Sequence, residues 1–351
     1  MTSASVRIGG REVGAGHPVY IVAELSANHG GRLDRALELV AAVADAGVDA
    51  VKIQTYRPES LTIDSDAPPF RVGAGSLWEG RRLWDLYAEA QTPWEWHDAI
   101  FAAARDAGIA CFSTPFDDAA IELLEGFDPP AYKVASFELV DLALVAAIAR
   151  RGRPVVMSTG MASVDEIDDA VRTARDAGAG GIVLLRCNSG YPAQPGEMDL
   201  RTIPDMIERW DVPVGLSDHT LGMTAAIASV GLGAVMLEKH VTTARADGGP
   251  DAAFSLEPAE LRALVASVRE AEAALGDVRY GPSPSEHASE PFRRSLYAVR
   301  DIAASETIAA DAVRSIRPAG GLAPKELPAV IGRRARVAIA RGTPISWDLL
   351  D

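Results

Sequence analysis

The sequence predicts a (β/α)8 barrel followed by a small β-rich domain. Three observations support this fold class. Short apolar runs recur eight times between residue 19 and about residue 240, and helical segments separate most of them. The runs are continuously apolar, as in strands that are covered on both faces. From about residue 292 the helical segments give way to short β-like runs and Gly/Pro turns.

The eight apolar runs are the predicted barrel strands. In chain order they are VYIVAE (19–24), AVKIQ (50–54), IACFS (109–113), AYKVA (131–135), PVVMS (154–158), GIVLLR (181–186), VPVGL (212–216) and AVMLEK (234–239). Eight strand–helix repeats over about 250 residues match the size of a TIM barrel. A doubly wound open sheet is the alternative, but no G-x-G-x-x-G follows the first run and the chain has no Walker loop.

Two of the segments between the runs are clear helices. LDRALELVAAVADAG (33–47) and SVDEIDDAVRTARDAG (163–178) have helical periodicity and end in glycine, a usual helix stop. The second segment opens with a predicted capping box, Ser163 with Glu166.

One connection breaks the repeat. Residues 55–94, between the second and third strands, are long and rich in tryptophan. Connections of this length are usually functional and often form a lid. The alternative is a surface excursion that Trp78, Trp84, Trp94 and Trp96 hold in place.

The C-terminal region is predicted to be a separate domain. YGPSPSEHASEP (280–291) is rich in Pro and Ser, as linkers are, and Gly342 and Pro344 mark a tight turn near the end of the chain. We therefore expect a catalytic barrel over 1–279, a linker over 280–291 and a small β domain over 292–351.

Composition excludes several classes of partner. The chain has 351 residues and a net charge of −15, from 49 acidic and 34 basic side chains, so a nucleic-acid partner is not expected. No run of about 18 apolar residues predicts a membrane span, and the N-terminus lacks the apolar stretch of a signal peptide. We expect a cytoplasmic protein, with Cys111 and Cys187 as buried free thiols.

Polar side chains follow all eight runs, and the active residues of a barrel lie at the C-terminal ends of its strands. A single serine at a strand end is usually a cap or turn residue, but polar side chains at all eight strand ends predict an active site. These residues are Glu24, Lys52 with Gln54, Thr114, Lys133 with Ser136 and Glu138, Ser158, Ser189 with Tyr191, Ser217 with His219, and Glu238 with His240.

Two lysines lie inside apolar strand ends, Lys52 after AV and Lys133 after AY. Burying an ammonium group is unfavourable unless an anion pairs with it. The anion is either a protein carboxylate in a salt bridge or, as we prefer, the phosphate or carboxylate of a ligand. Nearby Ser and Thr hydroxyls would complete such an anion cradle. A Schiff base on Lys133 is chemically conceivable, but we favour a non-covalent role.

Two histidines, His219 and His240, follow the last two strands, in SDH and EKH. Neighbouring strands bring these imidazoles close together, where they can hold one divalent metal and leave positions for water and substrate. A hydrogen-bonded structural pair is the alternative. His29, in the first strand–helix loop, either contacts substrate or orders that loop. We assign no chemistry to the remaining histidines, His17, His97 and His287.

The chain resembles the N-acetylneuraminate (sialic acid) synthases over nearly its whole length. The motifs that carry the resemblance are AELSANHGG, VKIQTY, FSTPFD, YKVASFEL, MSTGMA, SDHTLG and LEKHVT, and SIRPAGGLAPKELPAVIGRRA resembles the C-terminal antifreeze-like (SAF) domain of that family. LWEGRRLWDLYAEAQTPWEWH, LLRCNSGYPA and FRRSLYAVRDI are most similar to the pseudaminic acid synthase subfamily.

The resemblance implies roles for the matching residues. The set that would bind phosphoenolpyruvate is Lys52, Thr114, Lys133, Ser136, Ser158, Ser189 and Ser217. The set that would contact the amino sugar is Glu24, Phe116, Glu138, Tyr191, Asp251 and Arg317. His219 and His240 would ligate a divalent metal, typically Mn2+, with Mg2+ and Co2+ as alternatives. The catalytic groups would be Lys52, Lys133 and a general base, Glu24 or Asp251. Of the two bases we favour Glu24, since its place at the end of an apolar strand would raise its pKa.

The implied reaction joins phosphoenolpyruvate to 2,4-diacetamido-2,4,6-trideoxy-altropyranose, releases phosphate by C–O cleavage and gives pseudaminic acid. The alternatives are synthesis of N-acetylneuraminate or legionaminic acid, an aldolase or 3-deoxy sugar-acid synthase, and a non-catalytic carbohydrate- or ice-binding protein. The family likeness also implies a domain-swapped homodimer in which Arg317 reaches the partner's site. Two departures are Ser189, where asparagine is usual, and RPAGG, where RPGTG or RPGNG is usual.

Overall fold

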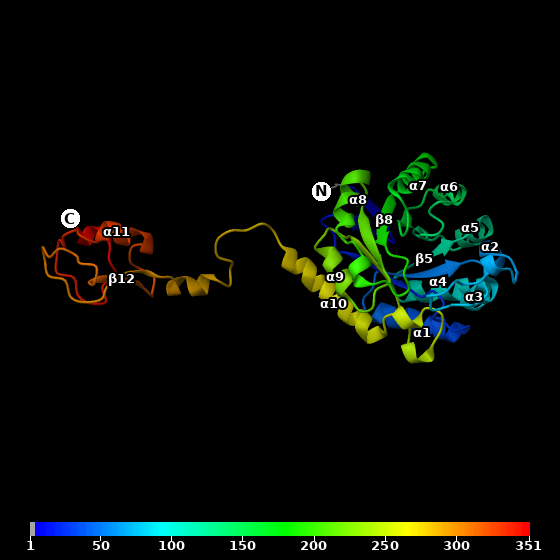
Figure 1. Cartoon of the computed structure of the whole chain (residues 1–351), viewed down its shortest axis with the longest axis horizontal. Coiled ribbons are helices and arrows are strands. Elements are labelled where there is room, and N and C mark those ends of the chain that lie inside the picture. The colour runs from blue at the N-terminus through cyan, green and yellow to red at the C-terminus, as the bar shows by residue number, and fades with distance from the viewer. Residues whose placement is uncertain (1–3) are drawn as a thin grey trace. The chain divides into compact units, whose positions relative to one another are not determined.

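The structure, a computed structural model, describes residues 4–351, which fall into two compact units (Figure 1). The larger unit ends at Gly276, and the smaller one runs from Asp277 to Asp351. Within the described residues, no helix is both long enough and apolar enough to cross a bilayer.

The larger unit is a closed barrel of eight parallel strands, which confirms the predicted (β/α)8 fold. Each strand pairs with its neighbour in sequence, and the last strand closes the ring by pairing with the first. The strands are β3 (Tyr20–Glu24), β4 (Ala50–Thr55), β5 (Ala110–Pro115), β6 (Tyr132–Val134), β7 (Val155–Ser158), β8 (Ile182–Cys187), β9 (Val214–Asp218) and β10 (Met236–His240).

The helices that cover the barrel bury one apolar face each, and these faces form a continuous core with the outward side chains of the strands. In α7 the predicted capping box is present, with Ser163 and Glu166 bonded to each other's backbone N–H. The main helices are α1 (Leu33–Asp45), α4 (His97–Asp106), α5 (Asp118–Glu125), α6 (Leu142–Ala149), α7 (Val164–Asp176), α8 (Thr202–Trp210), α9 (Thr224–Val230) and α10 (Pro258–Leu275).

Alternation along the strands separates the barrel interior into two levels, because side chains two residues apart share a face. The lower level, toward the strand N-termini, is apolar and includes Tyr20, Phe112 and Met236. The upper level, toward the C-termini, carries polar groups such as Lys52, which lies two residues beyond the buried Ala50. The sequence therefore directs the chemistry to the C-terminal end.

An N-terminal hairpin, which the sequence did not lead us to expect, packs against the lower level. Strands β1 (Ser5–Ile8) and β2 (Arg11–Gly14) are antiparallel. Val6, Ile8 and Val13 join the apolar cluster of the barrel interior. The hairpin therefore closes the end of the barrel opposite to the polar groups.

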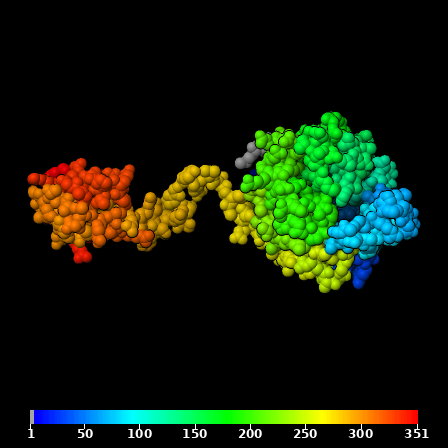
Figure 2. Space-filling view, in the orientation of Figure 1, coloured from blue at the N-terminus to red at the C-terminus, as the bar shows by residue number. Residues whose placement is uncertain are grey.

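The insertion between β4 and β5 folds into short pieces. These are α2 (Pro58–Leu61), a 3-10 turn at Pro68–Phe70, α3 (Leu83–Ala90) and a second 3-10 turn at Trp94–Trp96. Figure 2 shows most of this segment as a light-blue lobe on the surface of the barrel unit. The indole N–H of Trp78 donates to the carbonyl oxygen of Pro250 at 2.9 Å, so the insertion is fastened to the loop that follows β10.

The smaller unit has its own apolar core, which includes Leu296, Ile308, Val313 and Ile345. Strands β11 (Ser295–Ala298) and β12 (Val313–Ile316) are antiparallel, and α11 (Leu327–Val330) is a short α-helix of this unit. A 3-10 helix at His287–Phe292 includes part of the segment predicted as a linker. The turn predicted at the chain end is present, with Gly342 at φ 89°.

Candidate active site

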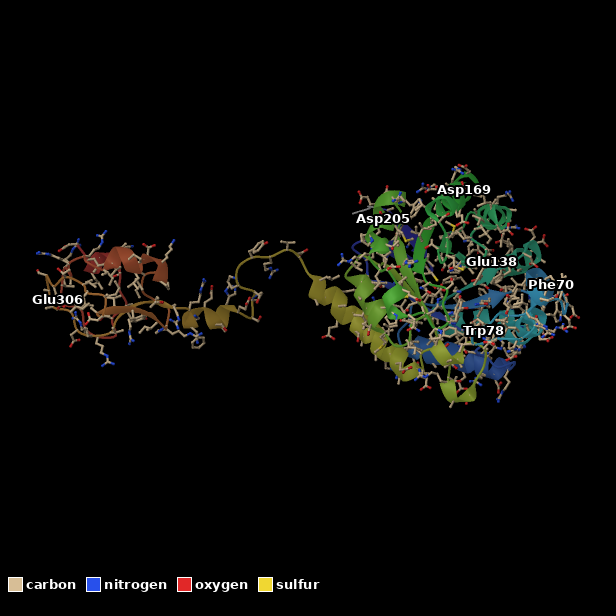
Figure 3. The ribbon with its side chains drawn as sticks, in the orientation of Figure 1. Phe70, Trp78, Glu138, Asp169, Asp205 and Glu306 are labelled. Atoms are coloured by element: carbon tan, nitrogen blue, oxygen red, sulfur yellow. The ribbon has the colours of Figure 1, made fainter. Side chains whose placement is uncertain are left out.

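A cavity of about 660 Å³ opens at the C-terminal ends of the barrel strands. Most of the residues predicted for the site line this cavity. Figure 3 labels two residues of the lining, the predicted Glu138 and Trp78 of the insertion. The predicted residues on its wall are Lys52, Thr114, Phe116, Lys133, Ser136, Glu138, Ser158, Ser189, Tyr191, Ser217, His219, His240 and Asp251. Two predicted residues are not on this wall. Glu24 lies beneath it, and Arg317 belongs to the smaller unit.

Lys52 is paired with protein carboxylates, which was the alternative to a ligand partner. Its ammonium Nζ lies 2.7 Å from Glu24 Oε2 and 3.6 Å from Glu238 Oε1, and it donates to Thr114 Oγ1 at 3.2 Å. Burial lowers the pKa of Lys52, but Glu238 and Glu24 outweigh burial and hold it above its ordinary value. Lys52 is therefore a fixed cation whose Nζ is already oriented within the cavity.

Lys133 has no such partner. Its Nζ donates to Ser158 Oγ and to the Val134 carbonyl oxygen, each at 2.7 Å, and no carboxylate of the described residues lies within 4 Å. Burial holds the pKa of Lys133 below its ordinary value, although Glu238 opposes this shift. A buried ammonium without a counter-ion is unfavourable, so this position is suited to an anionic ligand.

Hydroxyl groups surround the two ammonium groups. Ser136 and Ser189 come from different loops and approach each other at Gly160, whose N–H donates to Ser136 Oγ at 3.1 Å. A Cβ atom added at Gly160 would lie 2.4 Å from Ser189 Oγ and 2.8 Å from Ser136 Oγ. Gly160, which we had not singled out from the sequence, is therefore needed to bring these hydroxyls together.

The imidazoles of His219 and His240 lie side by side with ring centroids 5.2 Å apart. His219 Nδ1 donates to the carbonyl oxygen of Asn188 at 2.9 Å, which leaves its Nε2 free to act as a ligand. His240 Nδ1 is buried without a hydrogen-bond partner, and burial holds its pKa well below the ordinary value. A neutral imidazole with an unused nitrogen is the form that binds a metal.

The two histidines fit a metal, but only with help from other ligands. Among residues 4–351, no three His, Cys, Asp or Glu side chains are gathered closely enough to hold an ion. The nearest carboxylate oxygen recorded for His240 is Asp251 Oδ2, 3.7 Å from its Nδ1. Remaining positions would fall to water and substrate oxygen atoms, as expected for a catalytic rather than a structural site.

The two candidate general bases differ in access to the cavity. Asp251 lines it and accepts a hydrogen bond from Ser26. Glu24 is fully buried, and its oxygens are engaged by Lys52 and by Gln54 Nε2 at 2.9 Å. Burial raises the pKa of both carboxyl groups. The raised pKa expected for Glu24 is thus present, while Asp251 has the direct access.

Another part of the cavity wall combines aromatic rings with one unusual carboxyl group. Tyr191 lies against His219, with ring centroids 4.5 Å apart, and Phe116 lies 5.2 Å from Tyr56. Burial raises the pKa of Glu138 to about 7, so its carboxyl group is partly protonated at neutral pH. Such a group can donate to a carbonyl oxygen as well as accept from a hydroxyl or amide.

Two further residues of the cavity wall had no predicted role, Glu238 and Cys187. Glu238 accepts from Ser217 Oγ at 3.3 Å, and its second oxygen is buried without a partner. Burial raises its pKa, but Lys52, Lys133 and His219 outweigh burial and hold it below its ordinary value. Cys187, a free buried thiol as predicted, has its Sγ 3.8 Å from His219 Nδ1. The positions of both residues near the ends of strands were the sequence feature that could have identified them as part of the cavity wall.

The other histidines lie outside the cavity wall. His29 is buried, its Nδ1 accepts from the backbone N–H of Gly31, and its ring contacts that of Trp96 edge-on. Ordering of the first strand–helix loop is thus the role that these contacts support. His97 is buried against Thr55, with 2.7 Å between its Nε2 and Thr55 Oγ1.

Comparison with known proteins gives consistent matches. The NeuB family model matches residues 39–280, and the SAF domain model matches residues 293–351. Pseudaminic acid synthase of Campylobacter jejuni strain 81-176 is 42% identical over 92% of this chain and 94% of its own length. The synthase of that name from Helicobacter pylori is 38% identical over 95% and 98%. A sialic acid synthetase structure from Leptospira borgpetersenii superposes with a TM-score of 0.73 and 29% identity, covering 82% of this chain and 95% of that one.

Proposed function

Because the chain belongs to the NeuB family and ends in a SAF domain, we propose that it condenses phosphoenolpyruvate with 2,4-diacetamido-2,4,6-trideoxy-altropyranose to form pseudaminic acid and phosphate. The observation that carries this proposal is the unpaired, buried ammonium of Lys133, which lies among hydroxyl groups in the cavity. The identity to pseudaminic acid synthases over nearly the whole chain supports the choice of acceptor.

Phosphoenolpyruvate carries a phosphate and a carboxylate, and the cavity offers two ammonium groups. Lys133 has no carboxylate of its own and would take one of these anions. Lys52 would take the second while remaining paired with Glu24. The hydroxyls of Thr114, Ser136, Ser158, Ser189 and Ser217 would donate to the remaining oxygens. Both lysines would also stabilise charge as the phosphate leaves.

His219 and His240 would hold a divalent metal, for which we propose Mn2+. When bound, the ion would supply a Lewis acid to the aldehyde oxygen of the open-chain sugar. The chain's own contribution is to keep His240 neutral by burial and to orient His219 through Asn188. His219→Ala should lose the bound metal, measured by elemental analysis, and also turnover. His97→Ala is the matched control, a buried histidine outside the cavity that should keep its metal.

In the proposed reaction, C3 of phosphoenolpyruvate forms a bond to the aldehyde carbon of the sugar. The aldehyde oxygen takes up one proton and becomes a hydroxyl group. Water adds at C2 and gives up one proton, and the C2–O bond to phosphate then breaks, so that the phosphate leaves with both electrons. The hydroxyl group left at C2 passes its proton to the leaving phosphate and becomes the ketone. Asp251, which lines the cavity beside His240, would take the first of these water protons. Glu24 would act through Lys52 and Gln54, which it contacts directly.

A second candidate function is synthesis of N-acetylneuraminate or legionaminic acid, since those products need the same anion site. The protein is incubated with phosphoenolpyruvate, Mn2+ and a panel of amino sugars, and the products are identified by mass spectrometry. This experiment distinguishes the synthesis of pseudaminic acid, N-acetylneuraminate and legionaminic acid. We expect phosphate release and a nonulosonic acid from the diacetamido-trideoxy-altrose, and little from N-acetylmannosamine. Release from arabinose 5-phosphate or simple aldehydes instead would refute the proposal.

We further propose that the protein acts as a homodimer in the cytoplasm. Support for the dimer comes from the SAF domain, whose Arg317 is exposed and makes no recorded ion pair or side-chain hydrogen bond within residues 4–351. In the proposed dimer, Arg317 contacts the sugar in the site of the partner subunit. Two free thiols are in keeping with a reducing compartment.

A further inference from the structure

The insertion forms one wall of the cavity, and this wall carries no charged side chain. The rest of the lining, from the strand ends and the loops that follow them, carries the lysines, histidines and carboxylates. One cavity thus has an ionic floor and a largely apolar cover. The insertion residues on the cover are Tyr56, Leu61, Val72, Gly75, Ser76, Trp78, Leu83, Leu86, Tyr87 and Ala90.

The cover is held in a fixed arrangement. Val72 is paired through its backbone, donating to Arg81 O and accepting from Gly80 N, each at 2.9 Å. Trp78 donates to the Pro250 carbonyl oxygen at 2.9 Å, and its ring lies 5.5 Å from that of Tyr191. The indole N–H is therefore already used. What the cover presents to a ligand is mostly hydrocarbon and aromatic surface.

We propose that this cover is the selectivity subsite for the acceptor, with Val72 and Leu83 receiving the methyl groups at the far end of the sugar. The inference rests on the proposed function. When the aldehyde carbon reacts over the ionic floor, the 6-methyl group and the 4-acetamido methyl lie toward the other end of the chain. Apolar groups belong against Val72 and Leu83, because a hydroxyl group placed there would lose water without gaining a partner from these aliphatic side chains.

The selectivity that this subsite can give between two acceptor sugars has an expected magnitude. A hydrophobic pocket rejects an analogue that adds one hydroxyl by about a hundredfold at most. N-acetylmannosamine has hydroxyl groups at both C4 and C6, whereas the proposed acceptor has neither. The insertion would therefore contribute directly to the choice between these two acceptors.

The test replaces apolar cover residues with polar residues of similar size, Val72→Thr and Leu83→Gln. Leu77→Gln is the matched control, because Leu77 lies in the same insertion, is 50% exposed and does not line the cavity. For each variant, kcat/KM is measured with the diacetamido-trideoxy-altrose and with N-acetylmannosamine, together with the KM for phosphoenolpyruvate. Circular dichroism reports whether the variants fold.

We expect Val72→Thr and Leu83→Gln to lower the ratio of the two kcat/KM values by about tenfold or more. Leu77→Gln should keep the wild-type ratio, and all three variants should keep the KM for phosphoenolpyruvate. An unchanged ratio in folded, active Val72→Thr and Leu83→Gln overturns the subsite while leaving the proposed function intact. Wild-type protein that consumes no phosphoenolpyruvate with either sugar overturns both.

Discussion

Two buried lysines illustrate how context decides what a residue does. Lys133 faces the cavity without a carboxylate, whereas Lys239 faces away from it and is paired with Asp218 Oδ2 at 2.8 Å. Alternation along a strand explains the difference within β10, since Glu238 and His240 share the inner face and Lys239 takes the outer one. The same ammonium group is therefore left available for an anionic ligand at one position and is paired with a carboxylate at the other.

Replacing each lysine by methionine should separate these roles. Lys133→Met removes an unpaired buried charge, so stability should hold or rise while affinity for phosphoenolpyruvate falls by at least about a hundredfold. Lys239→Met leaves Asp218 buried without its partner and should lower the free energy of unfolding by about 3 kcal/mol or more. Isothermal titration with phosphoenolpyruvate and denaturant unfolding measure the two effects. Equal affinity in the two variants would contradict the assignment of Lys133.

The Glu138 carboxyl group should give the protein a pH-dependent stability. Burial raises its pKa from 4.5 to about 7. As pH rises through this window, the unfolded chain loses the proton before the folded chain does, so stability falls with rising pH. The cost at alkaline pH is of order 3 kcal/mol. Glu138→Gln should abolish this trend, so its thermal stability relative to wild type should be greater at pH 8 than at pH 5.

An exposed glutamate provides the control of opposite sign. Hydrogen bonds from Ser163 hold the pKa of Glu166 below its ordinary value. Its contribution to stability is present above pH 4.5 and lost as pH falls through the lowered value. Glu166→Gln should therefore differ from wild type less at low pH than at neutral pH. If Glu138→Gln showed this same trend, the burial argument for Glu138 would be wrong.

Most of the residues predicted for the site line one cavity, because a parallel barrel gathers its strand ends at one mouth. Lys52, Lys133, His219 and His240 were recognisable as polar groups that end apolar runs, and they share one cavity. The carboxylate partners of the buried lysines were harder to predict. The choice of Glu24 and Glu238 as partners of Lys52 depends on barrel closure, which places β3 between β10 and β4. The sequence alone does not give the distances between Lys52 and these two carboxylates.

At the scale of elements, periodicity identified every barrel strand, while the hairpin β1–β2 was missed. Its strands, SVRI and REVG, have only four residues each and mix charged with apolar residues. Such short segments resemble surface turns until the barrel interior that covers Ile8 is known. The insertion was recognised by its length, but its apolar face became evident only from the cavity that it covers.

The hairpin should matter for stability and not for catalysis, because it lies at the end of the barrel opposite to the site. Ile8 is fully buried in the lower cluster. Ile8→Ala should lower the free energy of unfolding by about 2 to 5 kcal/mol and leave the KM values unchanged. Arg7→Ala, at an exposed position of the same strand, should change neither the free energy of unfolding nor the KM values. A loss of kcat in folded Ile8→Ala would show that the hairpin also positions the residues of the site.

At the scale of the whole molecule, the proposed dimer makes a prediction that no single-chain enzyme shares. Lys133→Met should inactivate the barrel of its own chain, and Arg317→Ala should remove the side chain that the proposed dimer offers to the partner's site. Neither variant alone should be active. In a mixed dimer, however, the barrel of the Arg317→Ala chain is intact and receives Arg317 from the Lys133→Met chain, so one complete site forms.

Co-expression of the two variants, distinguished by different affinity tags and purified through both, tests this complementation. Random pairing makes half of the dimers mixed, each with one complete site of two, so the unselected mixture should recover about a quarter of wild-type activity. The doubly tagged fraction should recover about half. Active complementation requires that Arg317 acts across the subunit boundary. If Arg317 served the barrel of its own chain, every site in the mixture would lack one of the two residues, and the doubly tagged dimers would be inactive.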